Sequence, residues 1–159
     1  MKFSKRIYKN PAMFFKDFWF LAKNGGNIRK TMKSGIISHG FRERLMLAVT
    51  AVNGCKYCSY FHAKQALKSG LSQPEIDTLL SGSIAVCPEE ENIALLYAQH
   101  WAESDARPDS DAVNKLKEVY GDEKAQAIEL ILRMIRMGNL SGNTWDYFMY
   151  RISFGRLGG

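Results

Sequence analysis

Residues 41–62 read Phe41-Arg-Glu-Arg-Leu-Met-Leu-Ala-Val-Thr-Ala-Val52, then Asn53-Gly54, then Cys55-Lys-Tyr-Cys-Ser-Tyr-Phe-His62. The first run is apolar on nearly all sides after its first turn, which is typical of a buried helix, although Val49, Thr50 and Val52 leave a strand open. The pair Asn53-Gly54 interrupts this pattern, and a new helix is expected to begin at Cys55 and to end at Ser69-Gly70. The stretch therefore predicts two consecutive helices separated by a break at a glycine.

Helical signals continue on both sides of this stretch. We expect helices over residues 11–23, 27–34, 72–80, 88–103, 109–121 and 122–137, and a last segment over 144–152. The clearest start is Ser72-Gln-Pro-Glu75, which combines a capping box with an early proline. Glycines and asparagines over 138–143 are expected to interrupt the chain before the last segment. Alternating strand patterns do not compete, so the sequence predicts an all-α bundle of about seven to nine helices.

Composition restricts the class of protein. A chain of 159 residues with 46% hydrophobic and 24% charged residues is typical of one globular domain, not of a disordered, collagen-like or membrane-spanning protein. Three cysteines are too few, and odd in number, for a secreted disulfide scaffold. Polar residues interrupt the apolar ones near the start, which disfavours a signal peptide. We therefore expect a cytoplasmic protein whose thiols do redox or metal chemistry.

Positive charge is concentrated in the first quarter of the chain. Residues 1–44 hold 11 Lys/Arg and 2 Asp/Glu, whereas residues 45–159 hold 11 and 14. Since no phosphate loop or zinc finger accompanies this charge, we expect a solvated or partner-contacting surface and no nucleic acid. The same region has an apolar set, which we expect to pack on the core or a neighbouring subunit and not to contact a membrane. The set consists of Phe14, Phe15, Phe18, Trp19 and Leu21.

The candidate chemistry lies in one helix. Cys55, Cys58 and His62 fall at positions i, i+3 and i+7 of the expected helix, so their side chains share one face. Two thiols one turn apart can close a disulfide, and a helix N-terminus stabilises thiolate over thiol. His62 can accept the proton of Cys58 or return it to a leaving group. This pattern favours a redox dithiol, with a zinc site or unreactive structural cysteines as alternatives.

Glu43 precedes the thiols on the buried helix. It is the only acid between Asp17 and Glu75. A buried carboxyl group needs a partner, so we expect a relay from Cys58 through His62 to Glu43, directly or by a water. The alternative is an ordinary solvated acid paired with Arg42 or Arg44.

Other reactive residues lack comparable neighbours. Cys87 has no partner spacing and is interpreted as a structural thiol. Tyr57, between the two cysteines, is expected to be a packing residue more than a proton donor. His39 and His100 are interpreted as surface or packing residues.

Taken together, these motifs resemble a known family. The motifs are Glu43, then twelve residues further on Cys55-Lys-Tyr-Cys58 with His62, and then Ala66-Leu-Lys-Ser-Gly70-Leu-Ser with Glu75-Ile. They are similar to the carboxymuconolactone decarboxylase family, in the branch of alkyl hydroperoxidase D-like proteins. The resemblance is strong over 38–82 and compatible beyond. It predicts residues 1–35 as a basic aromatic N-terminal helical extension and residues 36–159 as the family-like domain.

The resemblance implies a function as well as a fold. It implies an oxidoreductase, a thiol-dependent peroxidase or disulfide reductase, that forms trimers or hexamers. The enzyme that the resemblance implies would use a hydroperoxide or disulfide as substrate, a dithiol protein or small thiol as electron donor, and no cofactor beyond its thiol pair. Cys58 would attack, Cys55 would resolve the intermediate, and His62 with Glu43 would relay protons. Dipole reasoning instead favours Cys55, nearest the helix start, as the more acidic thiol.

Two other functions remain open. Lactone decarboxylation, the reaction that names the family, needs acid–base groups and anion-binding cations, and the C-x-x-C pair argues against it. A non-enzymatic redox-sensing or adaptor protein is the other alternative, in which the basic aromatic N-terminus would be the docking surface.

Overall fold

The computed structural model describes residues 3–158, and within them the chain is helical and contains no strand. The elements are α1 (Pro11–Lys23), α2 (Gly25–Ser34), α3 (His39–Asn53), α4 (Lys56–Lys68), α5 (Gln73–Leu80), the short 3₁₀ helix η1 (Glu89–Glu91), α6 (Asn92–Glu103) and α7 (Ser110–Ile152). The prediction of an all-α fold is confirmed. The described range holds seven α-helices, the lower end of the expected number.

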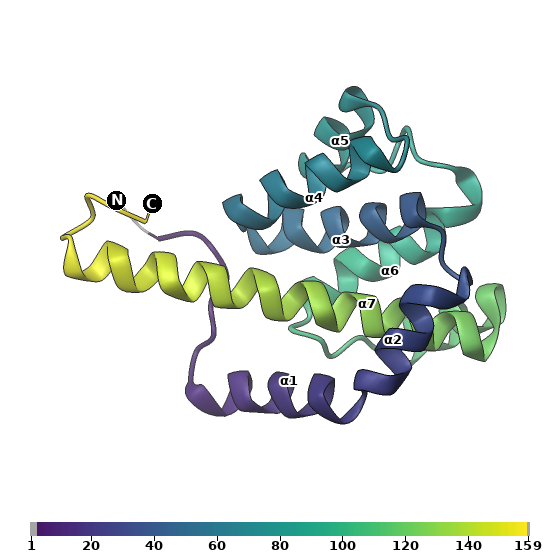
Figure 1. The fold of residues 1–159 in the computed structure, drawn as a ribbon, viewed down its shortest axis with the longest axis horizontal. Coiled ribbons are helices and arrows are strands. Elements are labelled where there is room, and N and C mark those ends of the chain that lie inside the picture. Colours follow the sequence, from purple (N-terminus) through teal and green to yellow (C-terminus); the bar gives the residue numbers. More distant parts are fainter. Residues whose placement is uncertain (1–2, 159) are drawn as a thin grey trace.

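Helix α3 is the centre of the bundle, and it packs against α4, α5, α6 and α7 (Figure 1). Its residues Leu45, Leu47, Ala48 and Val49 are fully buried, which confirms the buried helix predicted from the apolar run. One face of α3 joins α6 and α7 in the larger apolar cluster, while Leu47 joins the smaller cluster formed by α4 and α5. Because α3 is buried on all sides, any polar group that it carries needs a partner inside the protein.

Local capping explains most helix ends. The Ser72 hydroxyl accepts the Glu75 N–H at 3.3 Å, as the capping box predicts. The Asp109 carboxylate caps α7 by accepting the Ala112 N–H at 2.8 Å. The chain bends at Gly121, whose φ of 73° lies in the left-handed region, so the predicted helix stop there is a kink inside α7. Cys55 is the N-cap of α4, one residue before the helix proper.

The predicted interruption over residues 138–143 is wrong, because α7 continues through it to Ile152. Asn139 and Asn143 are fully buried, and their side chains bond to the end of α3. The Asn53 amide donates to Asn139 Oδ1 at 3.1 Å, and the Asn143 amide donates to the Asn53 carbonyl at 2.8 Å. These bonds and the surrounding packing outweigh the weak local preference of asparagine and glycine against a helix.

The N-terminal helices lie along α7 (Figure 1). Asp17 of α1 accepts hydrogen bonds from Arg136 of α7 and, at 3.0 Å, from the Tyr8 hydroxyl. Of the apolar residues expected to pack, Phe15, Phe18 and Trp19 are exposed in the single chain. No helix within residues 3–158 has the length and apolar character needed to cross a membrane.

Candidate functional site

The turn between α3 and α4 brings the two thiols together. Gly54, with φ of 71°, ends α3, and Cys55 follows in an extended conformation as the N-cap of α4. Its sulfur accepts the Cys58 backbone N–H at 3.3 Å and lies 2.7 Å from the Cys58 sulfur. Both thiols are free; Cys55 is fully buried and Cys58 is half-buried. The helix N-terminus thus holds a reduced pair in which one sulfur hydrogen-bonds to the other.

The two thiols differ in pKa. The pKa of Cys55 is lowered to about 7, chiefly by the hydrogen bond from the Cys58 thiol, which outweighs burial, and further by the backbone N–H groups of Cys58 and Tyr57. The pKa of Cys58 is raised by its hydrogen bond to Cys55 and by burial, although Asn139 lowers it. The first proton therefore leaves near neutral pH, and the thiolate that remains is stabilised by the second thiol.

His62 and Glu43 form a buried pair beside the thiols. His62 Nδ1 lies 2.7 Å from Glu43 Oε2, and Arg42 Nε lies 3.3 Å from Glu43 Oε1. Glu43 is only 3% exposed, so it is not the solvated acid of the alternative interpretation. Arg44 pairs elsewhere, with Glu75 and Glu91. Because a carboxylate only accepts, a neutral His62 ring donates its Nδ1 proton to Glu43, and in that tautomer Nε2 is an acceptor.

A cavity of about 360 Å³ connects Cys58 and His62 to the surface. Besides these two residues, its walls include Met46, Phe61, Met134 and Ile135 from α3, α4 and α7. The cavity contains Cys58 but not the fully buried Cys55. A small molecule that enters would therefore meet Cys58 first, in an apolar environment that includes one imidazole.

Helix α7 contributes site residues that sequence reasoning missed. Asn139 hydrogen-bonds to the Cys58 thiol, and Asp146, bound to Lys5 Nζ at 2.6 Å, opposes the ionisation of Cys55. Gly142 lets α7 approach the thiols, since a Cβ there would lie 3.3 Å from the Cys55 sulfur. The only local signal was the run of polar and small residues over 138–143, which was interpreted as a break.

Tyr57 also lines the thiol cavity, whereas Cys87 and His100 are not among the residues that line it. Tyr57 is exposed, and its pKa is raised by the charge of Asp146 and a hydrogen bond to it. Cys87 is half-buried, and burial together with the charge of Glu75 raises its pKa to about 11. His100 pairs with Asp109 at 2.8 Å. In the described part of the chain, no group of three or more His, Cys, Asp or Glu side chains is arranged to hold a metal ion.

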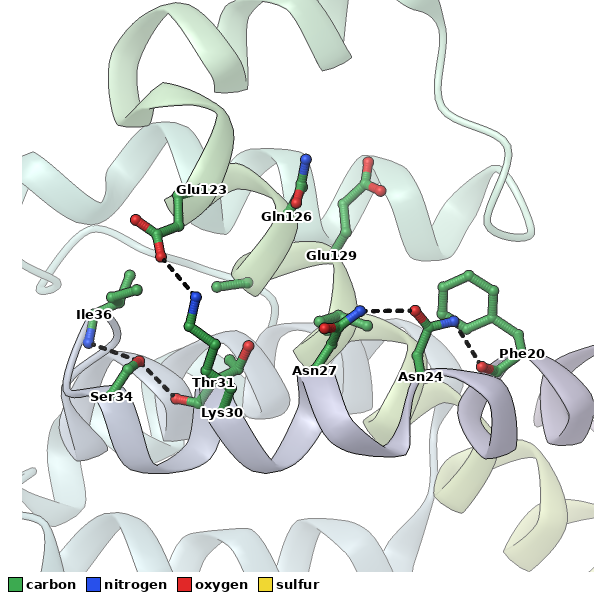
Figure 2. A pocket seen from close by; sticks show the side chains of 12 residues that line it. Phe20, Asn24, Asn27, Lys30, Thr31, Ser34, Ile36, Glu123, Gln126 and Glu129 are labelled. Atoms are coloured by element: carbon green, nitrogen blue, oxygen red, sulfur yellow. Dashed lines mark hydrogen bonds and ion pairs between the residues drawn. The ribbon is translucent and has the colours of Figure 1, made fainter.

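A second pocket, of about 270 Å³, lies between α2 and α7 (Figure 2). Its charged groups are already paired: Lys30 Nζ lies 3.5 Å from Glu123 Oε1, and Glu129 accepts the Tyr97 hydroxyl at 2.6 Å. None of the candidate site residues lines it. We therefore place the candidate site at the thiol cavity.

Fold and site together define an all-α protein with a dithiol at a helix N-terminus and a buried histidine–carboxylate pair beside it. The model of the carboxymuconolactone decarboxylase family matches residues 18–100, which is more than half of the chain, and the chain belongs to this family. The match includes Glu43, both thiols and His62. Comparison with curated proteins and with solved structures found no match. The family includes decarboxylases and hydroperoxidase D-like peroxidases, so membership indicates an enzyme but leaves the reaction open.

The two glycines of α7 near the site provide a matched test of this packing. We expect Gly138→Ala to stabilise the protein by about 0.5–1 kcal/mol, since alanine is the better helix former and nothing lies within 4 Å of the added Cβ. Gly142→Ala should lack this gain, because its Cβ would press on the Cys55 sulfur. Urea unfolding of both variants measures the difference. Equal stabilisation would contradict the close approach of α7 to Cys55.

Proposed function

We propose that this protein is a thiol-dependent peroxidase or disulfide oxidoreductase that works through a Cys55–Cys58 dithiol. The observation that carries the proposal is the 2.7 Å approach of the buried Cys55 sulfur to the sulfur of Cys58, which lines a cavity together with His62. Such a pair can alternate between dithiol and disulfide with little movement of the backbone. The reaction needs no cofactor, because the thiols themselves carry the two electrons.

In the peroxidase cycle, Cys58 is the attacking thiol. Its sulfur is the one that the cavity exposes, whereas Cys55 is fully buried. The Cys58 thiolate attacks a hydroperoxide oxygen, the O–O bond breaks, and Cys58 becomes a sulfenic acid as the alkoxide leaves. The Cys55 thiolate then attacks the sulfenic sulfur, the S–O bond breaks as the Cys55–Cys58 disulfide forms, and the hydroxide that leaves takes up a proton from solvent to become water. A dithiol protein or small thiol returns two electrons and two protons by exchange.

Protons move through His62 and Glu43 in this proposal. When Cys55 is ionised, the Cys58 thiol donates a hydrogen bond to its sulfur, so attack by Cys58 requires that the Cys58 proton move to Cys55 or to His62 Nε2. Glu43 holds the Nδ1–H side of the ring and stabilises the imidazolium that forms. The imidazolium then gives its proton to the leaving alkoxide. His62 is thus the general base and then the general acid, and Glu43 positions it.

Lactone decarboxylation has less support from the same cavity. A carboxylated lactone needs cations to bind it, and the residues that line the thiol cavity include no lysine or arginine. An apolar wall instead suits an organic hydroperoxide or a small disulfide.

Reaction of the reduced protein with an organic hydroperoxide tests the proposal. We expect peroxide consumption in the presence of a dithiol, an intramolecular Cys55–Cys58 disulfide in its absence, and a rate that rises with pH through about 7. Above that pKa Cys55 has lost its proton, so the Cys58 proton can move to the Cys55 sulfur and leave Cys58 as the attacking thiolate. Peptide mass spectrometry locates the disulfide. Absence of both peroxide loss and disulfide would overturn the proposal. If small disulfides oxidise the pair to the Cys55–Cys58 disulfide and hydroperoxides do not, the protein is a disulfide reductase. If the Cys55–Cys58 disulfide forms but hydroperoxide is not turned over, the protein is a redox sensor.

We also propose a homo-oligomer, a trimer or hexamer, in the cytoplasm. Support comes from the apolar residues that the single chain leaves exposed along the C-terminal half of α7, among them Trp145, Phe148 and Ile152. This half of α7 extends beyond the other helices (Figure 1). A groove of about 540 Å³ between it and residues 8–14 adds to this surface. Exposed apolar area of this kind is typical of subunit contacts.

A further inference from the structure

A third cavity, separate from the thiol site, is lined mainly by positive charge. It has a volume of about 240 Å³ and lies between α1, α7 and the loop that follows α6. The charged residues that line it are four cations and two carboxylates. The cations are Lys16, Arg107, Arg133 and Arg136, and the carboxylates are Asp17 and Asp105.

The two carboxylates are already committed to other partners. Asp17 accepts from Arg136 and from the Tyr8 hydroxyl. Asp105 accepts from Lys9 Nζ at 3.1 Å, a cation that does not line the cavity, and lies 3.5 Å from Arg136 Nη2. Although partial burial raises the pKa of Asp105, Lys9 and the neighbouring arginines bring it below its ordinary value. Because four cations but only two carboxylates line the cavity, it has a surplus of positive charge.

Arg133 has a buried donor with no acceptor. Its Nε is shielded from solvent and has no hydrogen-bond partner among the described residues. The guanidinium lies 4.3 Å from the centre of the Phe20 ring and 5.8 Å from that of Trp101, which fixes its plane by cation–π contact. An ionised donor left unpaired in this way costs free energy, and an anion in the cavity would remove that cost.

Lys16 and Arg107 lie at the mouth of the cavity. Both are exposed, and neither has an ion pair within residues 3–158. They approach from α1 and from the loop after α6, whereas Arg133 and Arg136 approach from α7. Donors therefore converge from three elements. This arrangement suits a tetrahedral phosphate, which presents oxygens in several directions, better than a planar carboxylate, which fits the fork of one guanidinium.

We propose that this cavity binds a phosphate group, either free phosphate or the phosphate monoester of a small molecule. Arg133 and Arg136 form its floor, and Lys16 and Arg107 close over the anion. The ligand is not the substrate of the thiols, because successive residues of a helix are about 100° apart. At that spacing Arg133 and Arg136 lie on the face of α7 opposite Met134, Ile135 and Gly138, which line the thiol cavity.

Calorimetric titration with inorganic phosphate, at constant ionic strength in chloride, tests this site. We expect saturable binding of one phosphate per chain, and binding weaker by roughly ten- to hundredfold in Arg133→Gln, since one charge-assisted hydrogen bond is lost. Arg107→Gln changes an exposed residue, so it leaves the fold intact and should also weaken binding. Arg29→Gln, which removes an equal charge from the exposed surface of α2, is the matched control.

Three results would overturn the assignment. These are no saturable binding of phosphate, equal weakening by Arg29→Gln, and tighter binding of succinate than of phosphate. Glycerol 3-phosphate in the same titration distinguishes the two sources of the group: tighter binding than phosphate identifies a monoester ligand, and weaker binding identifies free phosphate.

Discussion

Cys58→Ser is expected to abolish peroxide consumption, with a fall of roughly a thousandfold or more, as is usual when a nucleophile is removed. A serine hydroxyl does not ionise near neutral pH and cannot attack the O–O bond at a useful rate. The Cys55 sulfur that remains is fully buried, so it does not take over the reaction. The measurement is steady-state peroxide loss with excess dithiol. Cys87→Ser is the control and should keep the wild-type rate, because the pKa of Cys87 is raised to about 11.

Cys55→Ser gives the complementary result. We expect one round of oxidation, in which Cys58 forms a sulfenic acid that a dimedone probe traps, and then no turnover, because no resolving thiol is in reach. The two variants also decide between the sulfurs. The lowered pKa of Cys55 favours it as the ionised thiol, whereas the cavity exposes Cys58. A sulfenic acid trapped on Cys55 in Cys58→Ser, together with none in Cys55→Ser, would reverse the roles proposed above.

The sequence predicts the helices well where their ends are set locally. Ser72 and Asp109 bond to the first turn of the helix that they cap, and such contacts span three residues. The break expected over 138–143 fails for the opposite reason. Whether Asn139 favours or ends a helix depends on Thr50 and Asn53, which are more than eighty residues away in sequence and bond to its side chain. A local rule cannot include such partners.

The residues of the candidate site also divide into those that local spacing predicts and those that depend on contacts distant in sequence. Helical spacing predicts that Cys55, Cys58 and His62 share a face, because all three lie within two turns. The contact of His62 with Glu43 was expected from the need of a buried carboxylate for a partner, and the structure has it at 2.7 Å. Asn139, Gly142 and Asp146 carry no such signal. They reach the thiols only because α7 continues without a break past the α3–α4 turn.

Asp17→Ala is expected to destabilise the protein by about 3 kcal/mol, because it leaves the Arg136 guanidinium buried without its closest carboxylate. Arg136 is only 5% exposed, and the carboxylate that remains, Asp105, lies 3.5 Å away. The Tyr8 hydroxyl loses its acceptor as well. Since Asp17 joins α1 to α7, the loss should appear first as faster amide exchange in α1.

Urea unfolding measures the free energy, and two variants test its origin. Asp111→Ala removes an exposed carboxylate from the first turn of α7 and should cost only about 0.5 kcal/mol through the helix dipole. The double change Asp17→Leu with Arg136→Met should recover most of the loss, because an apolar pair of similar size replaces the buried charges. If the double variant is as unstable as Asp17→Ala, the loss comes from packing of α1 and not from an unpaired arginine.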